Sequence, residues 1–451
     1  MSVSQVIAVM DVGKTNKKLF LFDKDYNIVH EQSARFNETT DEDGDPCESL
    51  ESLRLSVFDS LRAVMSKKKF EIKAVNFSAY GASLVYIDEN GMPLTPLYNY
   101  LKSYPNALKD KFYKQYGGEE KFSSITASPV LGSLNSGMQL YRMKYEKPEI
   151  FAQIRYALHL PQYLAYLLSG KPLSDMTSIG CHTNFWDFEK NDYHDWVDKE
   201  GIRPLLAPIA KYDEVMQAGL YGNNYVAGIG LHDSSAALIP YLLNFREPFV
   251  LISTGTWSIS LNPFNRSPLT VDELKKDCLC YLDFKGNPVK ASRLFAGHMH
   301  DEQVKRICAH FNTDPLRYRN LAFDSALVSR IKKSATDFEK RELTDFVSDS
   351  EAYHALILDL VSKQYESTEL VLSGTRVKRI FVDGGFGKNV IYMHLLAAAF
   401  PDTEIFAASM PQATAMGAAL ALHSSWNDRQ IPSDLIELKY YAVTVQSAVG
   451  N

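Results

Sequence analysis

The sequence is short of cysteine and contains no long apolar or basic run. Its five cysteines are an odd number scattered through 451 residues (Cys47, Cys181, Cys278, Cys280 and Cys308), which favours reduced thiols over a disulfide framework. The Cys278-Leu-Cys280 segment lacks the spacing of a zinc site. No apolar stretch approaches the length of a membrane span, and the first residues lack the basic and apolar regions of a secretion signal. We therefore expect a cytoplasmic protein with no membrane partner.

Positive charge is not in excess either. The 48 lysines and arginines stand against 54 aspartates and glutamates, so the net charge is −6. This balance, without a long basic block, argues against a nucleic-acid partner. The chain is long for one hydrophobic core, and we predict two domains, residues 1–239 and 240–451. The sequence does not decide the oligomeric state and leaves a homodimer open.

The first organised segment predicts a β-hairpin. Residues 6–10 and 19–22 are apolar runs, and the turn between them begins at Asp11-Val-Gly13. The Gly13-Lys14-Thr15 tripeptide suggests a Walker A loop, but that motif requires glycine at the position of Ala8 and a helix afterwards. What remains is a carboxylate, Asp11, at a strand end beside a small polar turn. This arrangement suits a hydrated cation that bridges to phosphates.

Later segments repeat this design. Residues 248–262 again form an apolar strand, a small polar turn with glycine and a second strand, which indicates that one fold is used twice. Residues 379–389 form a strand that leads into a glycine-rich turn, and a helical stretch follows over 390–399. Residues 413–422 predict a small-residue helix that can pack closely on a neighbour. With the amphipathic helix predicted over 49–67, the pattern is α/β.

These segments together resemble the FGGY family of carbohydrate kinases over most of the chain. The family's first phosphate loop reads Asp-x-Gly-Thr-Thr-Ser-x-Arg. Asp11, Gly13, Thr15 and, with lysine for arginine, Lys18 match this pattern, whereas Lys14 and Asn16 depart from it. The resemblance implies two ribonuclease H-like domains of the actin, hexokinase and heat-shock-chaperone superfamily, with ATP and sugar in the interdomain cleft and Mg²⁺ at Asp11. The nucleotide-binding residues that it implies are Gly13, Lys14, Thr15, Asn16, Lys18, Thr254, Gly255, Thr256, Gly384, Gly385 and Asn389.

The same resemblance identifies a general base. The family places this residue in a Gly-x-His-Asp-like segment, which corresponds here to Asp233. A carboxylate in hydrogen-bond reach of a sugar hydroxyl can accept its proton as the oxygen attacks the γ-phosphorus. From the residues alone, Asp233 or Ser234 equally suits the cap of a helix that starts at Ser235. Only the order of the family's motifs favours catalysis.

The acceptor site is less clearly defined. The resemblance implies substrate contacts from Tyr80, Gly81, Tyr100, His182, His232 and Asp233. Asp175 either lines this site or caps a loop, and Lys102 stands where many members of the family carry an acidic residue. His298 and His300 lack further metal-ligand spacing, so we expect a surface or capping role for them. Residues 289–297 resemble the rhamnulokinase-like subgroup.

We therefore predict ATP-dependent phosphorylation of a ketose, deoxyketose or polyol. A catalytically silent sugar-binding or regulatory relative is the alternative, motivated by Lys14 and Lys102. A chaperone-like or actin-like ATPase ranks last, because the sequence lacks a separate peptide-binding region. ATP turnover that requires a sugar distinguishes the first hypothesis from the other two.

Overall fold

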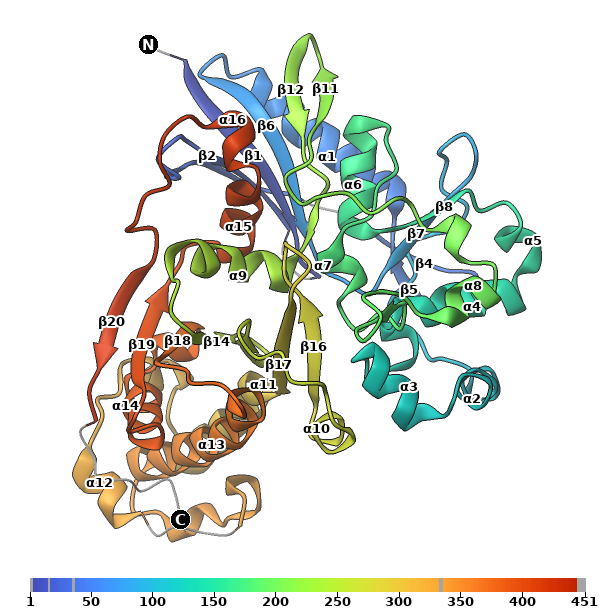
Figure 1. Cartoon of the computed structure of the whole chain (residues 1–451). Helices are drawn as coiled ribbons and strands as arrows, with labels where there is room; N and C mark the ends of the chain where they lie inside the picture. Colours follow the sequence, from blue (N-terminus) through green and yellow to red (C-terminus); the bar gives the residue numbers. More distant parts are fainter. Residues whose placement is uncertain (1–2, 15–16, 35–36, 332–335, 444–451) are drawn as a thin grey trace.

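The chain folds into two stacked lobes, each built on a mixed β-sheet (Figure 1). A computed structural model describes residues 3–14, 17–34, 37–331 and 336–443. Within these ranges, no helix is long and apolar enough to cross a membrane. The helices of the described part are α1 (Leu50–Met65), α2 (Asn106–Gln115), α3 (Glu119–Thr126), α4 (Ser136–Glu146), α5 (Pro148–Phe151), α6 (Leu160–Ser169), α7 (Met176–Ile179), α8 (Asp195–Lys199), α9 (Asp233–Asn244), α10 (Val271–Lys275), α11 (Ala296–Phe311), α12 (Ser325–Arg330), α13 (Asp349–Leu372), α14 (Val390–Ala399), α15 (Ala413–Ala421) and α16 (His423–Trp426), with 3₁₀ turns η1 (Gly132–Leu134), η2 (Arg203–Leu205), η3 (Pro315–Asn320), η4 (Phe338–Lys340), η5 (Leu343–Asp345) and η6 (Phe386–Lys388).

The first sheet comes from the N-terminal half. Its strands lie in the order β11-β12-β6-β1-β2-β3, and β13 also pairs with β6. The predicted hairpin is confirmed, since β1 and β2 are antiparallel and β6 runs parallel to β1. The strands are β1 (Ser4–Val12), β2 (Lys17–Phe22), β3 (Ile28–Ser33), β6 (Phe70–Ala79), β11 (Met216–Leu220), β12 (Asn223–Ala227) and β13 (Leu231–His232).

The second sheet repeats this plan in the C-terminal half. Its order is β16-β17-β15-β14-β18-β19-β20. Antiparallel β14 and β15 correspond to β1 and β2, and β18 runs parallel to β14 as β6 does to β1. The repeat predicted from the sequence is therefore confirmed as a shared topology. The strands are β14 (Phe249–Thr254), β15 (Ser258–Asn262), β16 (Cys278–Leu282), β17 (Pro288–Leu294), β18 (Arg379–Gly384), β19 (Glu404–Ser409) and β20 (Glu437–Tyr441).

Helices cover both faces of each sheet, because alternate residues of a strand point to opposite faces. On β1, Val6 and Ala8 pack outward with α1 and α6, whereas Ile7 and Val9 pack inward with α9 and α15. β14 alternates in the same way between α13 and α14 on its outer face and α9 and α15 on its inner face. Helices α9 and α15 thus lie between the two sheets (Figure 1).

The contact between α9 and α15 is unusually close. A side chain at Gly417 would place its Cβ 1.8 Å from the carbonyl oxygen of Ala236, so only glycine fits there. The Asn76 amide on β6 donates to the carbonyl oxygen of Ala418 at 2.7 Å. A C-terminal helix is therefore fastened to the N-terminal sheet. The domain boundary predicted between residues 239 and 240 falls within α9 and stays a prediction.

The segment between β6 and β11 adds an aromatic subdomain beside the first sheet. Its core contains Phe112, Tyr141 and Trp196, with Phe185 stacked on Trp196 at a centroid separation of 5.7 Å. The short sheets of the N-terminal half are β4 (Glu38–Thr40) with β5 (Pro46–Glu48), β7 (Leu84–Ile87) with β8 (Tyr156–His159), and β9 (Trp186–Asp187) with β10 (Asp192–Tyr193).

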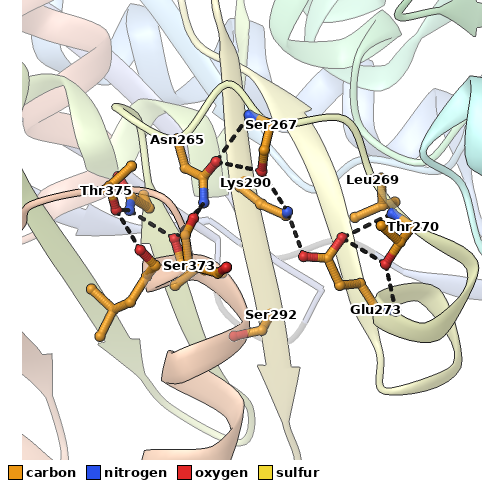
Figure 2. A network of polar contacts seen from close by, with 12 residues as sticks. Asn265, Ser267, Leu269, Thr270, Glu273, Lys290, Ser292, Ser373 and Thr375 are labelled. Atoms are coloured by element: carbon orange, nitrogen blue, oxygen red, sulfur yellow. Dashed lines mark hydrogen bonds and ion pairs between the residues drawn. The ribbon is translucent and has the colours of Figure 1, made fainter.

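A buried polar network holds the loop before β16 in the second lobe (Figure 2). The ammonium of Lys290 on β17 donates to Ser267 at 2.9 Å and to Glu273 at 2.5 Å, and Glu273 also completes a capping box with Thr270. This loop touches the first lobe, because the hydroxyl of Ser124 on α3 donates to the carbonyl oxygen of Leu269 at 2.8 Å. The network therefore fixes a contact that links the two lobes.

Candidate functional site

Asp11 lies near the carboxyl end of β1 and is joined to the C-terminal half. Its Oδ2 accepts a hydrogen bond from the hydroxyl of Thr414, at the start of α15, at 2.8 Å. Burial and, to a lesser extent, the nearby charge of Asp233 raise the pKa of Asp11 to about 6, although hydrogen bonds from Thr414 and Ser78 lower it. The negative charge of a buried carboxylate with a raised pKa is poorly compensated by its surroundings. Such a group is suited to bind a cation.

Asp233 faces the same region from the start of α9. The helix begins at Asp233 itself, its N-cap residue is His232, and no side-chain cap hydrogen bond forms there. The contacts that the described residues make with this carboxylate all involve Oδ1, from the Ser234 amide at 2.6 Å, the Ser234 hydroxyl at 3.3 Å and His232 Nε2 at 3.3 Å. Oδ2 thus remains available to a ligand, and 29% of the side chain is exposed.

The imidazole of His232 backs Asp233. Gly81 packs against this ring so closely that an added Cβ would lie 2.8 Å from His232 Cδ2. The thiol of Cys181 lies 3.4 Å from His232 Nε2, and the ring of Tyr281 on β16 lies 6.1 Å away in an edge-on arrangement. Nδ1 of His232 is buried and has no hydrogen-bond partner among the described residues.

His182 also lies near Tyr281, with ring centroids 6.2 Å apart. Burial lowers its pKa to about 3, so the imidazole is neutral near pH 7. Its backbone φ is +41°, an uncommon value for a residue with a side chain. Asp175 has the capping role, one of the two roles that the sequence allowed. Its buried carboxylate accepts hydrogen bonds from the amides of Thr177 and Ser178 at the start of α7.

Lys14 and Lys18 of the first loop contact different acidic partners. The ammonium of Lys14 lies 3.3 Å from Glu48 Oε1 and over the rings of Tyr80 and Tyr100, at 5.4 and 5.5 Å from their centroids. Lys18 pairs with Glu31 on β3 at 2.6 Å. The predicted phosphate contacts at Thr15 and Asn16 lie outside the described residues. Glu48 belongs to no recognised motif, so its contact with Lys14 was not predicted from the sequence.

The second loop meets the glycine-rich turn after β18. Gly384 has φ +91°, and an added Cβ would lie 1.9 Å from the carbonyl oxygen of Thr254. The hydroxyl of Thr254 donates to the carbonyl oxygen of Asp383 at 2.6 Å and accepts from the Phe386 amide at 3.0 Å. Thr254 and Gly384 therefore join the two turns.

A cavity with about 1300 Å³ of empty space opens in front of these turns. Four of the predicted nucleotide residues line it: Gly255, Thr256, Gly385 and Asn389. The amide of Asn389 is already engaged, since Oδ1 caps α14 through the Tyr392 amide at 3.1 Å and Nδ2 donates to the Tyr353 hydroxyl at 2.8 Å. Asn389 thus shapes the wall of the cavity.

Other residues of this wall were not predicted. His300 lines the cavity, and its Nε2 lies 3.1 Å from the Tyr353 hydroxyl. Tyr318 stacks on Tyr353 with centroids 4.6 Å apart. The sequence did not predict the contact between His300 and Tyr353, because Tyr353 lies on α13, which is distant in sequence. In the described part of the chain, no three His, Cys, Asp or Glu side chains could together hold a metal ion.

The unusual Lys102 is held by an acidic loop. Its ammonium lies 2.5 Å from Asp41, 2.7 Å from Asp43 and 3.2 Å from Asp45, and only 8% of its side chain is exposed. These contacts fasten the segment that carries Tyr100 to the loop before β5. Lys102 therefore stabilises the position of the segment around Tyr100.

Comparison with known proteins identifies the class that this fold and site define. The N-terminal domain of the FGGY family of carbohydrate kinases matches residues 6–211, and the FGGY C-terminal domain matches residues 246–430. The chain therefore belongs to the FGGY family of carbohydrate kinases. The two-domain α/β architecture predicted from the sequence is confirmed.

The individual relatives are distant. A rhamnulokinase of Mannheimia succiniciproducens is 24% identical over 268 residues, which cover 56% of this chain and 52% of that protein. The chain thus aligns with about half the length of this curated relative. The fold is similar to that of a carbohydrate kinase from Novosphingobium aromaticivorans (TM-score 0.79, 22% identity, covering 99% of this chain and 96% of the other). It is also similar to a xylulose kinase from Rhodospirillum rubrum (TM-score 0.81, 14% identity, 98% and 95% covered).

Proposed function

We propose that this protein transfers a phosphoryl group from ATP to a hydroxyl of a ketose, deoxyketose or polyol, with Asp233 as the general base. The observation that carries the proposal is the pair of carboxylates Asp11 and Asp233, which are close enough for one charge to raise the pKa of the other. Asp11 is buried and hydrogen-bonded, whereas Asp233 is partly exposed and the described residues contact only its Oδ1. These environments suit Asp11 to bind a cation and Asp233 to accept a proton.

In this proposal, Asp233 Oδ2 accepts the proton of the sugar hydroxyl as the hydroxyl oxygen bonds to phosphorus and the bond from phosphorus to the leaving oxygen breaks. The contacts of Oδ1 with Ser234 and His232 hold the carboxylate in one orientation. The positions of Gly81 and His232 beside this carboxylate support their proposed place in the acceptor site.

The residues fit ATP and Mg²⁺. The cavity beside the second loop is lined by Gly255, Thr256 and Gly385, where backbone amides can approach phosphates. Mg²⁺ in such sites is held by one or two carboxylates together with substrate phosphates. Asp11 suits this role, because a cation would compensate its buried charge. When bound, ATP would supply the transferred phosphoryl group, and Mg²⁺ would neutralise its negative charge.

A coupled ATPase screen over ketoses, deoxyketoses and polyols tests the proposal. We expect wild-type turnover only with a suitable sugar, and we expect Asp233→Asn to lower turnover by at least about 100-fold because the proton acceptor is lost. Nucleotide binding by calorimetry should be unchanged. Asp195→Asn is the matched control, since Asp195 also begins a helix but forms an exposed pair with Lys190.

Two results would contradict the proposal. A fully active Asp233→Asn variant would exclude the general base. Sugar binding without any stimulated turnover would indicate a catalytically silent relative.

A further inference from the structure

Lys14 stands where the family's first loop usually has threonine, and its side chain leaves that loop on the acceptor side. Its ammonium lies between Tyr80 and Tyr100, whose rings are 5.8 Å apart, and it contacts Glu48. All three partners come from the N-terminal half. The residues that line the 1300 Å³ cavity all come from the C-terminal half and do not include Lys14.

The surroundings of Lys14 connect directly to Asp233. Burial raises the pKa of the Tyr100 hydroxyl, and the charges of Asp233 and Glu48 raise it further. Gly81, which follows Tyr80, packs on the ring of His232 beside Asp233. Tyr100 and the Tyr80-Gly81 segment therefore lie between the surroundings of Lys14 and those of Asp233, the proposed general base.

The charge of Lys14 is only partly neutralised. The buried carboxylate of Glu48 is shared, since the ammonium of Lys17 also lies 3.3 Å from Glu48 Oε1. The side chain of Lys14 is 33% exposed, compared with 12% for Lys17. The two aromatic rings favour a cation at this place and restrict its movement. A fixed, partly exposed ammonium can donate hydrogen bonds to a ligand.

On the basis of the proposed function, we infer that Lys14 is an acceptor-specificity residue: its ammonium donates hydrogen bonds to hydroxyl oxygens of the sugar and does not bind the nucleotide phosphates. Glu48, Tyr80 and Tyr100 hold the ammonium in position for this contact. In this inference, Asp11 serves the phosphate side and Lys14 serves the sugar side of the same hairpin.

Kinetics of four variants test this inference with the sugar that gives the highest wild-type turnover in the panel. We expect Lys14→Thr, which restores the family residue, and Lys14→Met to raise the KM for the sugar by about 10- to 100-fold, as expected for the loss of a charge-assisted hydrogen bond. Lys14→Arg should stay within a few-fold of wild type. Lys24→Met is the matched control, because Lys24 pairs with Asp428 on the surface.

Calorimetry with Mg²⁺ and the non-hydrolysable analogue AMP-PNP measures the nucleotide side separately and needs no sugar. We expect the Kd of Lys14→Thr and Lys14→Met to equal that of wild type within about twofold. A raised nucleotide Kd, or a sugar KM that does not change in either variant, would overturn the inference. Failure of the proposed function itself would appear differently, as a wild-type protein that no sugar stimulates.

Discussion

Asp11 and Thr414 are 403 positions apart in the chain, yet the threonine hydroxyl donates a hydrogen bond to the aspartate at 2.8 Å. The bond joins the end of the first strand to the first turn of α15, the helix that packs between the two sheets (Figure 1). It lowers the pKa of a carboxyl group that burial has raised. The C-terminal half of the chain therefore tunes the proposed metal ligand of the N-terminal half.

Thr414→Val should weaken the binding of Mg²⁺ at Asp11. Loss of the hydroxyl raises the pKa of Asp11 above about 6, and a cation requires the ionised carboxylate. We expect the Mg²⁺ concentration at half-maximal rate to rise about 10-fold, as is typical when a partner of a metal ligand is removed. Initial rates at saturating sugar measure this, with Thr414→Ser as the control that keeps the hydroxyl. An unchanged Mg²⁺ dependence in Thr414→Val would argue against Asp11 as the metal ligand.

Lys102→Met should destabilise the protein. It removes the cation that faces Asp41, Asp43 and Asp45 and leaves the buried Asp41 carboxylate beside two like charges. We expect the free energy of unfolding to fall by roughly 2 to 4 kcal/mol, measured by urea unfolding. Lys24→Met removes an exposed ion pair and should change it by less than about 0.5 kcal/mol. Equal stability of the two variants would contradict a supporting role for Lys102.

Stability should fall as the pH is lowered below about 6.5, because His159 is buried and its pKa is lowered to about 3. Between these two values the unfolded chain binds a proton that the folded chain does not, so the unfolded state gains about 1.4 kcal/mol per pH unit from this group. The His159 ring also contacts the Ser136 hydroxyl at 3.0 Å.

His159→Gln should remove this contribution, about 2 kcal/mol between pH 7.5 and pH 5. Urea unfolding at a series of pH values measures it. His310→Gln is the control, because the His310 side chain is exposed. The same slope in wild type and His159→Gln would show that His159 takes up its proton in the folded state.

The local elements could be predicted from the sequence. The hairpins over residues 6–22 and 248–262 and the helix α14 (Val390–Ala399) agree with the structure, because alternating apolar runs and glycine turns encode them within a short window. The repeat of this pattern predicted two lobes of the same topology. Asp11 and Asp233 were found because each ends or begins such an element within a recognisable motif.

The partners of the site residues could not be predicted in this way. Glu48 meets Lys14 across 34 positions, Asp41 meets Lys102 across 61, and Thr414 meets Asp11 across 403. No local period relates such residues, since their distance depends on how strands pair and how the sheets stack around α9 and α15. The sequence by itself determined the elements and the repeat, and it predicted the roles of the two carboxylates. Only the tertiary structure decided the surroundings of Lys14, because packing of distant segments brings Glu48, Tyr80 and Tyr100 around its ammonium.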